Sequence, residues 1–316
     1  MINDFFNIRN SELRFFVFLS VGLTLVMTAS YVIGVRVERK DISAPTEVAG
    51  NSFPKVELQA KAAYVYDARN QSVIYAQNEN TRMPLASLTK VMTALVAQEL
   101  SPEYGTVVVS RDALLAQGDS GLHAGERWSL RDLLDFSLIT SSNDGMRAVA
   151  LALGALDRSE ANPEEVINDF VNQMNSKASA LDLKNTYYWN ETGLDESDVK
   201  GGAYGTAKDM SMLMSYIVTY HPEIIEATRQ SAATIYSLDE LGHEARNTNA
   251  LAGSIPGLLA SKTGYTNTAG GNLTLVFDPE LGRPIVVTVL GSTERGRFED
   301  ASKLISATLE YISKGN

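Results

Sequence analysis

Alternating apolar and polar residues predict strands near both ends of the globular part of this chain. Residues 62–78, AAYVYDARNQSVIYAQN, hold two runs rich in β-forming residues around a polar stretch that suits a hairpin turn. Residues 272–278 and 284–291 are again short and mostly apolar, as buried strands are. We therefore expect one sheet that is assembled from the two ends of this region.

The residues between these strands have a helical pattern instead. VMTALVAQEL follows Lys90, and the stretch from about 110 to 230 contains LRDLLDFSLI, DGMRAVALALGAL and PEEVINDFVNQMNSKASAL. A final amphipathic segment at 299–312 predicts a last helix. Strands at both ends of a helical middle indicate a mixed α/β fold with an inserted helical subdomain.

An uncharged N-terminal run predicts a membrane anchor. Residues 15–35, FFVFLSVGLTLVMTASYVIGV, are long enough to cross the hydrocarbon of a bilayer as a helix. A cleaved signal peptide followed by secretion is the alternative, although Thr28-Ala29-Ser30 is a poor cleavage site. We divide the chain into an anchor at 1–36, a flexible linker at 37–59 and a catalytic domain at 60–316.

Composition narrows the possible partners. The formal net charge of −11 and the absence of cysteine argue against nucleic-acid binding, disulfides and a thiol nucleophile. His123, His221 and His243 lie far apart in the sequence without metal-ligand spacing, so we expect no metal and no cofactor.

Candidate chemistry begins at Ser87 and Lys90, at the start of a predicted helix. Residues three apart share a helix face, so the lysine amine can lie beside the hydroxyl and accept its proton. The helix N-terminus favours a developing alkoxide. The bland alternative is a helix-capping serine with a surface lysine, and the pattern S-x-x-K alone is a weak signal.

Two further motifs follow in the chain. Ser141 and Asn143 lie after an apolar helical segment, where a cap and a turn would also explain them. Lys262-Thr263-Gly264 precedes the apolar residues 272–277, and a solvated strand edge would explain it equally well. Read one at a time, these motifs leave function open.

Taken together, the motifs resemble penicillin-binding proteins and β-lactamases, which carry S-x-x-K, S-x-N and K-T-G in this order. ASLTKVMTALVA, SSNDGMRAVA, NETGLD, GTAKDM and SKTGYTNTAGGNLT look like the low-molecular-mass penicillin-binding proteins that are serine D-alanyl-D-alanine carboxypeptidases. The similarity covers residues 60–316. It implies a β-lactamase/transpeptidase-like fold with an antiparallel sheet.

The resemblance also implies a role for each residue. Ser87 would be the acylated nucleophile and Lys90 its general base, with Ser141 and Asn143 forming the second wall of the cleft. Lys262, Thr263 and Gly264 would form the opposite wall. The backbone amides of Ser87 and Tyr265 would form the oxyanion hole, and Arg297 would hold the substrate carboxylate, although Arg295 stands two residues away.

The implied reaction is removal of the terminal D-alanine from peptidoglycan stem peptides, with β-lactams as covalent inhibitors. Such a substrate lies outside the cytoplasmic membrane, so the catalytic domain would lie on the outer face, held there by residues 15–35 in the bilayer. Well-known members often carry a second, β-rich domain and a C-terminal membrane helix, and neither is expected here.

Three alternatives remain at this point. A D,D-endopeptidase acting on cross-links would use the same residues. A β-lactamase of class A would need a glutamate to activate water, for which Glu191 is the nearest candidate. A penicillin-sensing or wall-binding module would need no nucleophile with its base.

Overall fold

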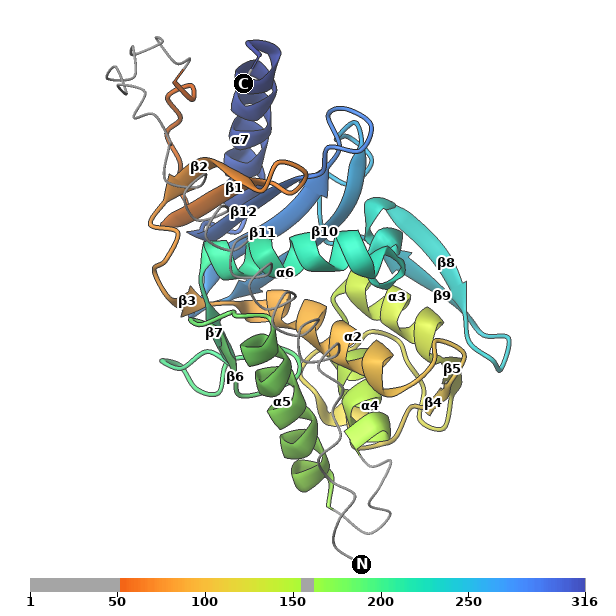
Figure 1. The fold of residues 1–316 in the computed structure, drawn as a ribbon. Coiled ribbons are helices and arrows are strands. Elements are labelled where there is room, and N and C mark those ends of the chain that lie inside the picture. The colour runs from red at the N-terminus through yellow and green to blue at the C-terminus, as the bar shows by residue number, and fades with distance from the viewer. Residues whose placement is uncertain (1–51, 155–161, 316) are drawn as a thin grey trace, which may run out of the picture. The chain divides into compact units, whose positions relative to one another are not determined.

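The structure, a computed structural model, describes residues 52–154 and 162–315 (Figure 1). The predicted anchor at 15–35 and most of the predicted linker fall outside these ranges. Within them, no helix combines the length and the apolar character that a membrane span requires. The fold described here is that of the compact unit that begins at Asn51.

The last part of the predicted linker packs against the domain. Phe53, Val56 and Leu58 are partly buried against the cluster formed by the sheet and the C-terminal helix α7 (Gly296–Ser313). The packed region therefore begins before residue 60, where we had set the domain boundary. Apolar residues spaced along 53–58 cover hydrophobic surface that would otherwise meet water.

A five-stranded antiparallel sheet is assembled from both ends of the domain, as the sequence predicts. The first strand pairs with the last, with Ala62 opposite Leu290 and Asp67 opposite Ile285. In spatial order the strands are β10 (Leu258–Thr266), β11 (Gly270–Phe277), β12 (Ile285–Ser292), β1 (Ala62–Asp67) and β2 (Ser72–Gln77).

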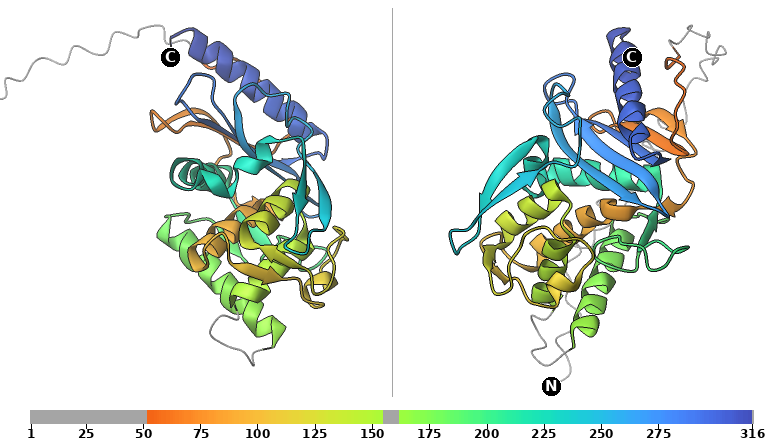
Figure 2. Two further views of the ribbon diagram at one scale, coloured as in Figure 1. Left: turned by 90° about the vertical axis from the view of Figure 1, so that its right-hand side faces the viewer. Right: turned by 180° about the vertical axis from the view of Figure 1, so that it is seen from behind.

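Helices cover both faces of this sheet. Figure 2 shows α7 on one face and α6 (Ala207–Tyr220) on the other. Strand β12 is buried along its whole length for this reason, which explains why IVVTVLGS lacks the alternation of a strand with one wet face.

The helical subdomain packs below α6 in the view of Figure 1. Its central helix is α2 (Thr89–Leu100). All residues from Thr89 to Ala97 are buried, so this helix is covered on every side and not only on one face. The surrounding helices are α3 (Leu130–Thr140), α4 (Asn143–Gly154) and α5 (Pro163–Ala180).

Short elements connect these parts. One small antiparallel sheet has the strand order β3 (Met83–Pro84), β7 (Ala203–Gly205) and β6 (Tyr187–Tyr188). A second one pairs β4 (Thr106–Val108) with β5 (Arg127–Ser129). Single 3₁₀ turns are η1 (Ala86–Leu88), η2 (Ala113–Leu115), η3 (Pro222–Ile224) and η4 (Glu226–Arg229).

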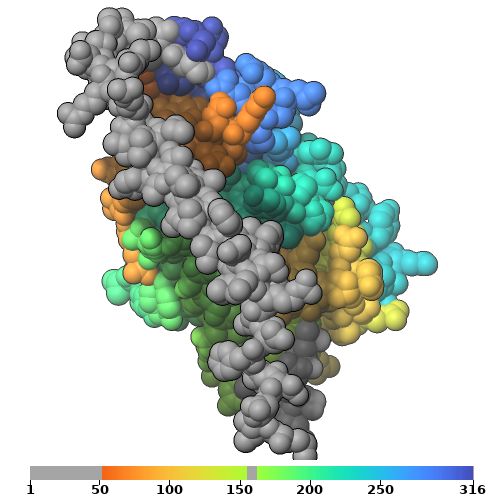
Figure 3. All heavy atoms as spheres, viewed as in Figure 1, coloured from red at the N-terminus to blue at the C-terminus, as the bar shows by residue number. Residues whose placement is uncertain are grey.

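A hairpin of β8 (Ala232–Tyr236) and β9 (Gly242–Arg246) stands out from the side of the domain (Figure 3). Its anchor is His243, whose Nε2 lies 2.7 Å from Glu126 Oε1, with both side chains buried. This hairpin is not apparent from the sequence, because GHEAR is too polar to resemble a strand.

Candidate active site

Ser87 lies in the turn η1, directly before α2. The N-cap residue of α2 is Leu88 and not Ser87, so the capping interpretation of this serine is wrong. Instead, Ser87 Oγ lies 2.9 Å from Lys90 Nζ in the first turn of α2. The preceding residue, Ala86, has a φ of 49°, a left-handed conformation that side chains rarely adopt. Strain of this kind persists where the surroundings enforce it.

Lys90 is fully buried and has three partners. Besides Ser87 Oγ, its amine contacts Asn143 Oδ1 at 2.7 Å and the carbonyl oxygen of Thr192 at 2.8 Å. Burial lowers the pKa of Lys90 to about 7, and the nearby Glu191 carboxylate opposes that shift. At neutral pH about half of this lysine is therefore the neutral amine.

The neutral amine has only one direction in which it can accept a proton. It has two N–H groups, and Asn143 Oδ1 and the Thr192 carbonyl are both acceptors without a proton to give. With those two bonds formed, the nitrogen lone pair is left for Ser87, the one partner that carries a hydroxyl proton. This arrangement is that of a general base beside its nucleophile.

The junction between α3 and α4 supplies two different contacts. Ser141 is the C-cap of α3 and has a left-handed φ of 63°. The chain turns at this residue, so the side chains of Ser141 and Asn143 reach different partners. Ser141 Oγ accepts from Lys262 Nζ at 2.9 Å, whereas Asn143 contacts Lys90. The S-x-N motif thus joins the two lysines on opposite sides of the cleft.

Lys262-Thr263-Gly264 lies within strand β10. The apolar residues 272–277 belong to the next strand, β11. Lys262 is buried, and burial, followed by the charges of Lys90 and Arg297, holds its pKa well below the usual value for lysine. The Thr263 hydroxyl lies 2.6 Å from that of Thr248.

Gly264 lies against the segment that carries Ser87. A β-carbon there would lie 2.8 Å from the Leu85 carbonyl oxygen and 3.1 Å from the Ser87 nitrogen. The glycine therefore lets β10 lie against the segment that carries Ser87. It also brings the backbone amide of Ser87 beside the strand that continues to Tyr265, a residue that is 46% exposed.

The two arginines near the last helix differ clearly. Arg295 is exposed, whereas Arg297 is 7% exposed and donates from Nη1 to the Gly264 carbonyl oxygen at 2.8 Å. Its Nε is buried and has no hydrogen-bond partner among the described residues. Arg297 is thus the arginine that borders the cleft, and it retains a donor with no partner there.

Sequence motifs did not reveal several contacts of the site. Thr192 contributes only its backbone carbonyl, and no side-chain pattern identifies such a group. Asn272 Nδ2 donates to the carbonyl oxygens of Pro84 and Leu85, which ties β11 to the segment just before Ser87. Asp195 accepts from the hydroxyls of Thr266 and Thr268 at the β10–β11 turn, at 2.9 and 2.7 Å.

Comparisons with known proteins support the family resemblance that the motifs indicate. The sequence profile of a family described as D-alanyl-D-alanine carboxypeptidase matches residues 46–293. A D-alanyl-D-alanine carboxypeptidase of Bacillus subtilis, DacF, is 28% identical over 88% of this chain and 69% of its own length. A D-alanyl-D-alanine endopeptidase of Pseudomonas aeruginosa is 29% identical over 83% of each chain.

Solved structures share the fold. The crystal structure of a D-alanyl-D-alanine carboxypeptidase from Mycobacterium tuberculosis has a TM-score of 0.70 at 26% identity, covering 82% of this chain and 94% of that one. A Streptomyces DD-transpeptidase has a TM-score of 0.72 at 23% identity, over 81% and 99% of the two chains.

Lys90 is expected to lose its proton near neutral pH, because its burial disfavours the charged form. We predict a midpoint of about 7 when the ¹⁵N-lysine-labelled protein is titrated by NMR. Lys177 is the internal control: burial alone would lower its pKa, but the hydrogen bond to Glu99 raises it above the usual value. A Lys90 signal that stays protonated above pH 9 would contradict the geometry proposed for the base.

Proposed function

The chain belongs to the D-alanyl-D-alanine carboxypeptidase family, and from this we propose that Ser87 is the nucleophile of its serine-type peptidase reaction. The substrate is the D-Ala–D-Ala end of a peptidoglycan stem peptide. One observation carries the assignment of Ser87: Lys90 Nζ lies 2.9 Å away and has its two other contacts occupied by acceptors.

In the first step, Ser87 Oγ attacks the carbonyl carbon of the penultimate D-alanine while its proton passes to Lys90 Nζ. The carbonyl oxygen becomes an oxyanion, which the backbone N–H groups of Ser87 and Tyr265 stabilise. The C–N bond then breaks, the proton held by Lys90 passes to the amine of the terminal D-alanine, and an ester on Ser87 remains.

Water completes the cycle. Lys90 accepts a proton from the water that attacks the ester, and Ser87 regains its own proton as the shortened peptide leaves. Ser141, bonded to Lys262, and Asn143, bonded to Lys90, hold these groups in place along the second wall of the cleft.

Positive charge suits the substrate's C-terminal carboxylate. Burial lowers the pKa of Lys262, and the positive charges of Lys90 and Arg297 lower it further. Their mutual repulsion falls when a carboxylate binds among them, so the same charges favour an anionic chain end. This local field is positive although the chain as a whole carries −11.

A D,D-endopeptidase is the second candidate. The Pseudomonas aeruginosa relative named for that activity covers 83% of this chain and 83% of its own length. The β-lactamase alternative has less support, because the Glu191 carboxylate is paired with Arg147 and its side chain is only 2% exposed. A purely sensing module would have no use for the Ser87–Lys90 contact.

We also propose that residues 15–35 anchor the chain in the cytoplasmic membrane, with the catalytic domain on the outer face. The support is the uncharged run itself and the location of the substrate. Because residues from Phe53 onward pack against the domain, the connection between anchor and domain would be 37–52.

Labelled penicillin is expected to attach covalently to the wild-type protein and not to Ser87→Ala, because the acyl bond forms at the serine hydroxyl. The wild type should also release free D-alanine from a stem pentapeptide. Ser110→Ala, whose hydroxyl accepts from Ala113 N, serves as the control that retains both activities. Release from cross-linked dimers alone would favour the endopeptidase, and labelling of Ser87→Ala would refute the assigned nucleophile.

Arg297→Ala is expected to raise KM for the pentapeptide by about tenfold or more, since a hydrogen bond to a charged group contributes about 1.5–3 kcal/mol. Arg295→Ala is the matched control and should change KM less than twofold, because that side chain is exposed. Steady-state release of D-alanine measures both. Equal effects of the two substitutions would mean that Arg297 has no part in substrate binding.

Removal of residues 1–36 is expected to give a protein that stays in solution after ultracentrifugation and still binds penicillin. The full-length chain should sediment with membranes and resist extraction by high salt, as a spanning helix does. Full-length protein found in the soluble fraction would rule out the anchor.

A further inference from the structure

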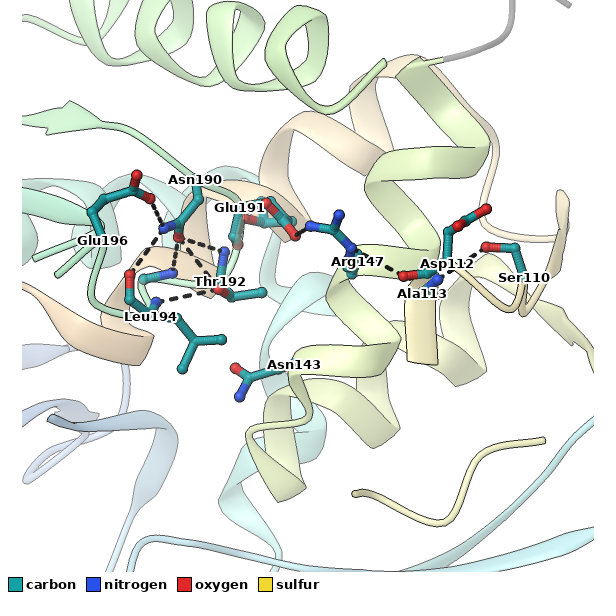
Figure 4. A network of polar contacts seen from close by, with 12 residues as sticks. Ser110, Asp112, Ala113, Asn143, Arg147, Asn190, Glu191, Thr192, Leu194 and Glu196 are labelled. Carbon is teal, nitrogen blue, oxygen red and sulfur yellow. Dashed lines mark hydrogen bonds and ion pairs between the residues drawn. The ribbon is translucent and has the colours of Figure 1, made fainter. Parts of the chain in front are cut away.

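A partly buried ion pair lies behind Lys90. Glu191 Oε1 and Arg147 Nη1 are 3.3 Å apart, and the glutamate side chain is only 2% exposed. Figure 4 shows the two side chains directed toward each other, Glu191 from the loop after β6 and Arg147 from α4. Arg147 Nε also donates to the Asp112 carbonyl oxygen, so the pair joins three separate segments.

The loop that carries Glu191 contacts α2 through its backbone. The Glu191 carbonyl oxygen accepts from Thr93 Oγ1 at 2.6 Å, and the next carbonyl, that of Thr192, accepts from Lys90 Nζ. Asn190 Oδ1 accepts from the Gly193 amide at 2.7 Å, which closes the turn around these carbonyls. Moving Glu191 would therefore move an acceptor of Lys90.

Helix α4 carries the other acceptor. Asn143 begins that helix and Arg147 follows one turn later, so the two side chains share a face. The Arg147–Glu191 pair thus ties the element that holds Asn143 Oδ1 to the loop that holds the Thr192 carbonyl. The distance between the two acceptors decides where the remaining lone pair of the amine points.

We propose that Glu191 and Arg147 are positioning residues for Lys90: their ion pair fixes the separation of the Asn143 and Thr192 acceptors, so that the amine faces Ser87. This rests on the proposed role of Ser87 and Lys90. Neither residue of the pair touches the nucleophile, and neither belongs to the S-x-x-K, S-x-N or K-T-G motifs.

The charge of Glu191 adds a second effect. Glu191, from the 190–196 loop, acts on Lys90, and Arg147 of α4 pairs with that glutamate. Lys90 in turn acts on Lys262 of β10, as does Arg297 of α7. Glu191 raises the pKa of Lys90 against the larger, opposite effect of burial. Without that carboxylate the amine would lose its proton at lower pH and be a weaker base.

The test measures the second-order rate of acylation by a labelled penicillin between pH 5 and 9, with full-length protein in detergent. The wild-type rate should rise with pH around a midpoint of about 7, as Lys90 loses its proton. In Glu191→Gln the midpoint should move to lower pH by roughly half a unit or more, and the plateau should fall about tenfold.

Arg147→Met tests the tether without removing the carboxylate. Its plateau should also fall about tenfold, and the double variant should be no slower than the slower single variant, since the two residues act as a unit. If Glu191→Gln does not fold, the Arg147→Met plateau alone decides the proposal.

Asp67→Asn is the matched control, because Asp67 is a buried carboxylate that accepts from Arg283 Nε at 2.8 Å at the end of β1, outside the cleft. It should lower the melting temperature and leave the pH profile unchanged. A similar result for Glu191→Gln, with loss of stability and a wild-type profile and plateau, would overturn the proposal. A wild type that is not acylated at all would instead refute the role of Ser87.

Discussion

The cleft depends on the cost of burying one lysine. A charged amine inside a protein must be paired or must give up its proton, and Lys90 is surrounded by neutral acceptors with a single carboxylate nearby. Partial loss of the proton is the cheaper outcome, which turns an ordinary ammonium into a base near neutral pH. Every element that contacts Lys90 also excludes water from it, so packing and reactivity have one origin.

That packing requires unusually close backbone approaches around the nucleophile. Strand β10 reaches the Ser87 segment only because position 264 lacks a β-carbon, and the loop at Gly193 reaches Ala86 for the same reason, with a φ of 80°. Ala86 is held in a left-handed conformation between them. Two glycines and one strained alanine thus allow three segments to meet at a hydroxyl group.

The sequence predicts the parts of this site that lie in side-chain motifs. Ser87 and Lys90 stand three residues apart at the start of a predicted helix, and together with the other two motifs this spacing predicts their contact. The sheet with strands from both ends follows from the β-rich runs. The site contacts at Thr192 and Asn272 could not be predicted, because they join distant segments through backbone carbonyls. The β8–β9 hairpin was missed as well, since its strands are short, polar and anchored by a buried His243–Glu126 contact. The motif identifies the glycine at position 264, whereas the reason that a side chain does not fit there comes from the structure.

The pairing of β1 with β12 has a consequence for the synthesis of the chain. Residues 62–67 remain without their neighbour on one side until residues 285–292 have been made, and Lys262 joins Ser141 across 121 positions. Contacts of such long range form late, after the entropic cost of closing the loop between them has been met. A growing polypeptide therefore holds Ser87 and Lys90 without the strand that carries Lys262. The hydrolase therefore remains inactive until nearly the whole chain has been synthesised.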